Sequence, residues 1–177
     1  MKKKPLILSS ILLITGLFSC SSPASQCKQL ASVTQSYQTL RDGFKADIES
    51  AQVAASGAEN LAEVQDAAAQ YTAAVDTVTS QLDEMIQDLS GLNISDSQLD
   101  EYRESYVINL TDSQNALSRA GEAMVSVRDA ESEEALRKVF NQYQTEGNQA
   151  YDDILTLGAS EAALVEQVNE YCGQAVE

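Results

Sequence analysis

Apolar residues recur every three or four positions along most of the chain. The sharpest run lies between Ala58 and Leu89 and consists of Leu61, Val64, Ala68, Tyr71, Val75, Val78, Leu82, Met85 and Leu89. An unbroken spacing of threes and fours over several heptads is typical of a helix whose apolar stripe packs in a bundle or coiled coil. The pattern therefore predicts a long amphipathic helix in this part of the chain.

Similar spacing predicts further helices before and after this run. The first covers about residues 25–55 and ends at Gly57, because glycine is favoured directly after a helix. A third helix begins at a cap on Asp96 or Ser97, where acidic residues follow in the first turn. A fourth begins at Ser132, which two glutamates follow. The sequence thus predicts four helices with short connections.

The end of the fourth helix is predicted to break. Gly158 and Ser160 combine a helix stop with a fresh cap. An unbroken helix from Ser132 to Cys172 would be about 60 Å long, against about 42 Å for the first helix. We therefore expect an all-α fold: an antiparallel up-down four-helix bundle with a short C-terminal fifth helical segment that folds across its open end.

The first twenty residues have a different character. Lys2, Lys3 and Lys4 precede an apolar run from Pro5 to Phe18, and small polar residues follow. A positive start, a short apolar run and small residues form the pattern of a secretory signal. As a helix the run would span about 21 Å, which is too short for a hydrocarbon core of about 30 Å. We therefore expect export rather than a permanent membrane-spanning helix.

The end of this segment resembles the lipobox of bacterial lipoprotein precursors. Leu17, Ser19 and Cys20 match its pattern of leucine, a small or β-branched residue, a small residue and cysteine, whereas Phe18 is bulkier than usual at the second position. The resemblance implies diacylglycerol on the Cys20 thiol and cleavage before Cys20. Ser21 stands where many inner-membrane lipoproteins carry aspartate, which favours the periplasmic face of an outer membrane if the source is Gram-negative. The alternative is an ordinary secreted protein with Cys20 free or disulfide-bonded.

These features divide the chain into three parts. Residues 1–19 are the cleaved signal peptide, residues 20–26 are a lipid-anchored tether, and residues 27–175 are the helical bundle domain. The polar part of the tether reaches only about 20 Å when fully extended. We therefore expect a domain that lies close to the bacterial membrane to which Cys20 anchors it.

Cys27 and Cys172 remain as a pair once Cys20 is lipidated. An even number of cysteines in an exported and oxidising compartment favours a disulfide. In an up-down bundle the start of the first helix and the end of the fourth lie at the same end, which suits this pairing. Two buried free thiols are the alternative.

Composition narrows the range of functions. The chain has 27 acidic and 11 basic residues, a formal net charge of −16 and no histidine. Nucleic-acid binding requires a basic surface, so we expect no nucleic acid as partner. Histidine-dependent triads, histidine zinc sites and histidine-ligated haem are excluded. We therefore expect no catalytic residues, no metal site and no cofactor.

Acidic side chains nevertheless cluster at three places. The clusters are Asp83, Glu84 and Asp88; Asp96, Asp100, Glu101 and Glu104; and Asp152 with Asp153. Carboxylates suit calcium or magnesium, but no stretch has the spacing of an EF-hand loop, and a solvated acidic face is the simpler interpretation. Ser113 and Gly147 mark a looser layer between the third and fourth helices, either a small ligand site or a close helix contact.

Together these patterns predict a cell-envelope lipoprotein with a non-catalytic structural or protein-interaction role. Its expected partners are the membrane, through the lipid on Cys20, and a protein of the envelope. The alternative is a small-molecule or cation-binding carrier that uses the bundle interior or the acidic rim. An interaction protein requires an exposed apolar or mixed patch along one bundle face, whereas a carrier requires an enclosed cavity or convergent carboxylates.

Overall fold

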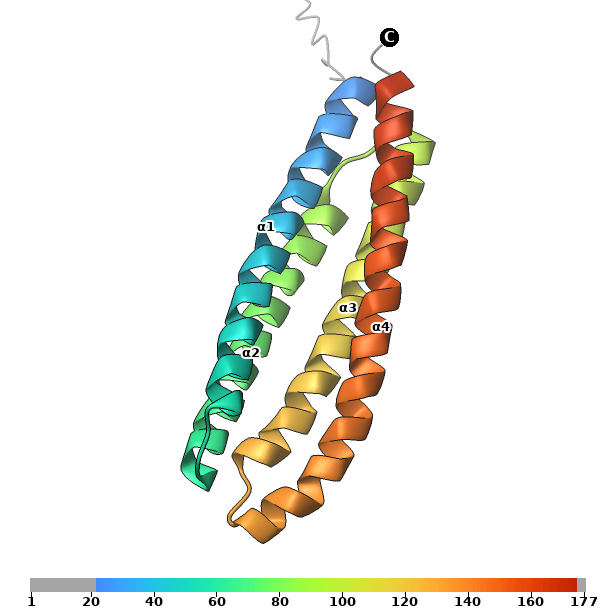
Figure 1. The fold of residues 1–177 in the computed structure, drawn as a ribbon. Coiled ribbons are helices and arrows are strands. Elements are labelled where there is room, and N and C mark those ends of the chain that lie inside the picture. The colour runs from blue at the N-terminus through green and yellow to red at the C-terminus, as the bar shows by residue number, and fades with distance from the viewer. Residues whose placement is uncertain (1–21, 175–177) are drawn as a thin grey trace, which may run out of the picture.

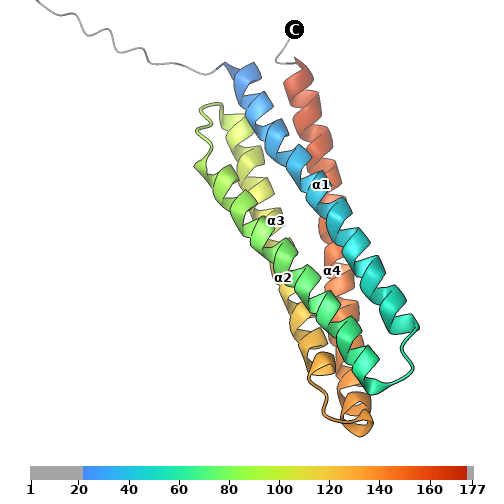
Figure 2. The same cartoon turned by 90° about the vertical axis from the view of Figure 1, so that its left-hand side faces the viewer.

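Four long helices make up residues 22–174, the range that the computed structural model of the chain describes. They are α1 (Pro23–Ser56), α2 (Leu61–Gly91), α3 (Ser97–Arg128) and α4 (Glu133–Gln174), and this range contains no strand. Successive helices run in opposite directions and lie side by side in one elongated bundle (Figures 1 and 2). The predicted all-helical class is confirmed.

Side-chain caps set where the helices begin. The Ser22 hydroxyl accepts a hydrogen bond from the Ser25 amide, and Pro23 occupies the first helical position, where a proline has no hydrogen bond to lose. The last four residues of the predicted tether (20–26) are therefore helical, so α1 begins earlier than expected. Asp96 caps α3 as predicted, because its carboxylate accepts hydrogen bonds from two backbone N–H groups.

The core is built mainly on α2 and α3. From Val75 onward every predicted inward position of α2 is buried. The main cluster of buried apolar side chains draws from α2, α3 and α4 the residues Val75, Val78, Leu82, Met85, Leu89, Leu99, Tyr106, Leu110, Leu117, Leu164 and Val168. Each Å² of apolar surface that they remove from water stabilises the fold by roughly 25 cal/mol.

A glycine allows α2 and α3 to approach closely. A Cβ atom added to Gly121 of α3 would lie 2.9 Å from Cγ1 of Val75 on α2. That is shorter than van der Waals contact, and Val75 is buried and stiff at χ1, so it has little room to move. Gly121 is therefore a packing requirement of the α2–α3 interface.

The predicted fifth helical segment is wrong, because α4 continues without a break from Glu133 to Gln174. Gly158 has no positive φ, so it does not form a left-handed helix stop. A glycine inside a helix costs only about 1 kcal/mol, and Leu164 and Val168 beyond it are buried in the same core. The extra length of α4 extends past the α1–α2 connection at the far end of the bundle (Figures 1 and 2).

Candidate functional site

The middle of α1 is poorly covered by the other helices. Between Leu30 and Ala51 it has no buried residue. Its apolar stripe in this interval is only half-buried and consists of Val33, Tyr37, Leu40, Phe44 and Ile48. α1 packs mainly against α2 and makes few contacts with α3 and α4. One side of its stripe therefore borders solvent.

An open groove of about 460 Å³ runs between α1 and α2 on this side. Its apolar lining comes from Leu40 and Phe44 of α1 and from Val78 and Met85 of α2. Most other lining residues are small or uncharged: Ser36, Thr39, Gly43, Ala74, Thr77 and Gln81. A Cβ added to Gly43 would meet no atom within 4 Å, which shows how open the groove is at this point. We call it the α1–α2 groove.

Three carboxylates complete the lining of the α1–α2 groove: Asp47, Glu84 and Asp88. The two helices run in opposite directions (Figure 2). Asp47 therefore lies toward their connecting loop, and Glu84 and Asp88 lie toward the other end. None of the three takes part in an ion pair with another described residue. The sequence of α2 contains no lysine or arginine. The groove therefore combines apolar and small uncharged residues along its length and is negative at both ends.

A second polar region lies inside the bundle around Glu161 of α4. This residue is only 4% exposed, and its Oε2 lies 3.9 Å from Nη1 of Arg41, whose side chain is mostly exposed. Burial raises the pKa of the Glu161 carboxyl, and the Arg41 charge offsets only part of that effect. Burial also raises the pKa values of Tyr37 and Tyr106, and the charge of Glu161 adds to both shifts. The carboxyl therefore holds a proton more strongly than an exposed glutamate.

Asn109 of α3 belongs to the same region. Its Nδ2 donates a hydrogen bond of 3.2 Å to the carbonyl oxygen of Leu157, one turn before Glu161 on α4. Its buried Oδ1 accepts no hydrogen bond from the described residues. One turn further along α3 lies the buried Ser113, whose side chain offsets part of the raised pKa of Tyr37 on α1. This polar layer joins α1, α3 and α4 and contains acceptor oxygens that can take a proton or a hydrogen-bond donor.

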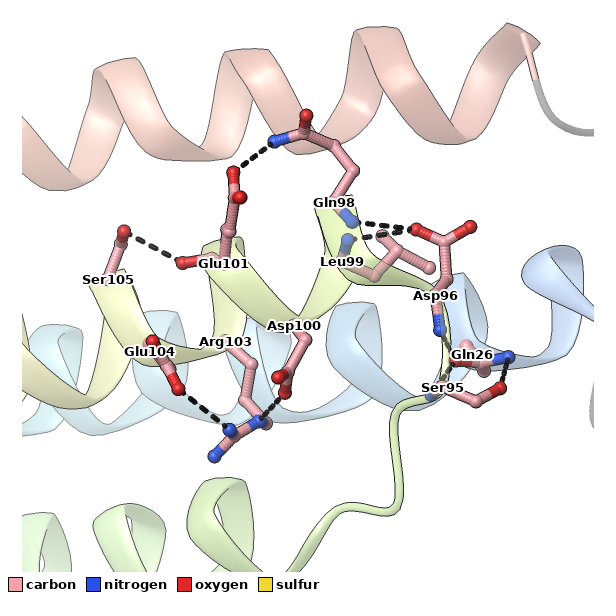
Figure 3. Close-up of polar contacts among 10 residues, drawn as sticks. All are labelled: Gln26, Ser95, Asp96, Gln98, Leu99, Asp100, Glu101, Arg103, Glu104 and Ser105. Carbon is pink, nitrogen blue, oxygen red and sulfur yellow. Dashed lines mark hydrogen bonds and ion pairs between the residues drawn. The ribbon is translucent and has the colours of Figure 1, made fainter.

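A third group of polar residues ties together the end of the bundle where α1 begins. Gln26 is 1% exposed, and its Oε1 accepts hydrogen bonds from the backbone amides of Ser95 (2.7 Å) and Asp96 (3.0 Å). Its Nε2 donates to the Ser95 hydroxyl at 3.1 Å (Figure 3). The Tyr171 hydroxyl lies 2.9 and 3.0 Å from the two carboxylate oxygens of Asp96, and this hydrogen bonding raises its pKa. We call these four residues the terminal latch.

The predicted cysteine pair lies directly beside the terminal latch. Cys27 follows Gln26 and Cys172 follows Tyr171, and the structure joins the two cysteines in a disulfide with Cα atoms 5.8 Å apart. The two helix ends that the sequence placed together are therefore adjacent. Cys20, the predicted lipidation residue, lies outside the described residues.

The predicted acidic clusters have several different roles. Asp100 and Glu104 flank Arg103, with N···O distances of 2.7 and 3.6 Å (Figure 3), and Asp153 pairs with Arg119. Across residues 22–174 no three side chains of the metal-binding types gather to hold a metal ion. The first cluster instead supplies two of the carboxylates of the α1–α2 groove.

Sequence reasoning missed Glu161, Asn109 and Gln26 as members of polar sites. Glu161 lies four residues after Leu157 and three before Leu164, so a charged residue at an inward-facing position was visible. The predicted break at Gly158 hid this signal, because it gave the following segment a new helical phase. Gln26 and Asn109 carried no comparable signal, since buried amides depend on partners that are distant in sequence.

The family model described as "Uncharacterised lipoprotein PM1805" matches residues 26–159. The match covers most of the chain, from the start of α1 into α4, and the chain belongs to this lipoprotein family. The resemblance to bacterial lipoproteins is thereby confirmed, and it implies attachment to a membrane through lipid. No match to a curated protein or to a solved structure is found. Over the described range, no helix is both long and apolar enough to cross a membrane.

Proposed function

We propose that this chain is a non-catalytic lipoprotein of the cell envelope whose up-down bundle engages a partner protein along the α1–α2 groove. The groove itself carries the proposal. The half-buried Leu40 and Phe44 lie beside the buried Val78 and Met85 along one long face of the bundle, with carboxylates at both ends. Protein interfaces combine an apolar centre with a polar rim, and the groove has both.

The position of the groove along α1 suits a partner in the aqueous compartment. α1 is capped by Ser22, two residues after the proposed lipid anchor at Cys20, so at most about 7 Å of chain separates anchor from helix. The groove starts at Ser36, about 20 Å further along the helix axis. The terminal latch therefore lies near the membrane, which we take to be the periplasmic face of an outer membrane, and the groove lies further from it.

A site-specific cross-link in the native envelope tests this function. The full lipoprotein would carry a photo-reactive amino acid in place of Gly43, inside the groove, or in place of Gly158 on α4 as the matched control. Both glycines are helical, and an added Cβ meets no atom within 4 Å at either position. We expect a discrete protein adduct from position 43 that position 158 does not form. Equal adducts from both positions, or none from position 43, would refute an interaction role for the groove.

The lipid anchor is tested separately. Cys20→Ala should release the protein from the membrane fraction, because the variant lacks the thiol that would carry the lipid. Retention of this variant in washed membranes would show that Cys20 does not hold the protein there.

A carrier of a small cation or amine is the second candidate, and the polar layer around Glu161 favours it. Glu161 supplies a buried carboxylate, and Asn109 supplies a buried carbonyl oxygen without a partner in the described chain. Native mass spectrometry of the protein purified from its own envelope separates the two functions. A stoichiometric small ligand that is bound to the parent protein and absent from Glu161→Gln would support the carrier. A protein without any bound small ligand would favour the interaction role.

A further inference from the structure

We propose that the occupant of the α1–α2 groove is an amphipathic helix of another protein that carries lysine or arginine near both of its ends. This inference rests on the proposed interaction function and specifies the chemistry of the partner. It follows from the dimensions of the groove, from its charge and from the charge that this chain itself can supply.

The dimensions favour a helix as occupant. On the α1 side the groove extends from Ser36 to Asp47, which is about 17 Å or roughly three turns of helix. Two packed helices present a furrow that accepts the side-chain ridge of a third helix, and helix-in-groove recognition uses apolar anchors one turn apart. Gly43 has no side chain and Ala74 has only a methyl group, so a third helix can approach the groove closely at these positions.

The charge of the groove specifies the ends of the occupant. Asp47 lies at one end, and Glu84 and Asp88 lie at the other. Unpaired carboxylates around an apolar floor attract a cationic partner, fix its register and reject an acidic one. A three-turn helix with small or aliphatic residues in its middle and positive charge near both ends matches the apolar floor of the groove and the carboxylates at its ends.

A second copy of this chain does not fit that description. Of the eight lysines and arginines within residues 22–174, seven already form ion pairs with carboxylates of the same chain, and the eighth is Lys28. The whole chain has a net charge of −16, so two copies repel each other. Anionic lipid head groups are repelled for the same reason. The cations must therefore come from a different protein.

A designed peptide tests the inference on the mature lipoprotein, purified in detergent with its disulfide intact. The probe is a fluorescent alanine-rich peptide of about 18 residues, long enough to be helical, with leucines along one face and two lysines near each end. Its matched controls are a scrambled peptide, whose leucines no longer share a face, and the same peptide with glutamate in place of each lysine. Fluorescence anisotropy at low and at physiological salt gives Kd for each.

We expect saturable binding of the lysine peptide only, weakened by salt. Replacing Asp47, Glu84 and Asp88 by their amides should raise Kd about tenfold, because each exposed ion pair contributes roughly a two- to threefold change. Gly43→Leu should fill the groove and abolish binding, whereas the matched Gly158→Leu should leave Kd unchanged. Circular dichroism establishes that each variant is folded.

Equal binding of the scrambled or glutamate peptide, or unchanged binding to the amide variant and to Gly43→Leu, would overturn the inference. The result is separable from a failure of the proposed function. If the lysine peptide fails while position 43 still cross-links to another protein in the envelope, the partner chemistry is wrong and the interaction role stands. If both fail, the interaction role itself falls.

Discussion

Replacing both Cys27 and Cys172 with alanine should destabilise the domain strongly. The disulfide links residues 145 positions apart, so it restrains nearly the whole unfolded chain while it joins two helix ends that are already neighbours. In the folded state the terminal latch holds the same ends together without the disulfide. The expected loss therefore comes mainly from the unfolded state, which gains freedom when the cross-link is removed.

The chain-entropy relation for a loop of this length gives about 5 kcal/mol at 25 °C, as an upper value. Domains of this kind are stable by only about 5–15 kcal/mol, so the variant should be close to marginal. For a urea m-value of about 2 kcal/mol/M, the unfolding midpoint should fall by up to about 2.5 M. The m-value itself should rise, because an unfolded chain without the cross-link exposes more surface.

Urea unfolding of the mature protein, followed by far-UV circular dichroism, measures both quantities. The parent protein in reducing agent should behave like the double alanine variant, and the variant itself should not respond to the reducing agent. A midpoint that changes by less than about 0.5 M would contradict the reasoning. It would mean either that the two cysteines are not joined in the native protein or that its unfolded state keeps the chain ends together.

Three further substitutions, the first with a matched control at Gly158, test the packing and the polar sites through the same urea midpoints. Gly121→Ala should destabilise the fold by up to about 2 kcal/mol, because the new methyl group clashes with Val75. The matched Gly158→Ala, whose methyl group meets no atom, should stabilise the fold by about 1 kcal/mol. Equal effects of the two substitutions would contradict the close contact at Gly121. Gln26→Ala should cost about 2–3 kcal/mol and accelerate hydrogen exchange at the two loop amides that it binds. Burial raises the pKa of the Glu161 carboxyl, so the folded chain binds a proton at this residue more strongly than the unfolded chain does. The contribution of Glu161 to stability therefore falls as pH rises from about 4.5 through the folded pKa. Glu161→Gln should therefore be more stable than the parent at about pH 7.5 but not at about pH 4, and the same difference at both would refute the assignment.

The helices were predictable because periodicity and caps are local signals. The stripe from Leu61 to Leu89 and the cap at Asp96 each lie within one short stretch, and both hold in the structure. The break at Gly158 was predicted from local signals too, and it was wrong because tertiary packing outweighed them. Burial of the residues after Gly158 in the common core contributes more than the roughly 1 kcal/mol that a helical glycine costs.

The candidate sites were much less accessible to sequence reasoning. The cysteine pairing could be predicted, because count, compartment and topology all pointed to the same two residues. The α1–α2 groove depends on which face of α1 the other helices leave uncovered, and the spacing of Leu40 and Phe44 alone predicts a buried stripe there. Only the structure shows that this stripe is half-buried and that Glu84 and Asp88 lie beside it.

The most direct test of the account is to identify the peptide that a photo-cross-linker at position 43 captures in the native envelope, by mass spectrometry of the digested adduct. We expect a segment of a different protein that has an apolar stripe at helical spacing and lysines or arginines near both ends. A peptide of this chain itself, or an acidic or unpatterned segment, would contradict it.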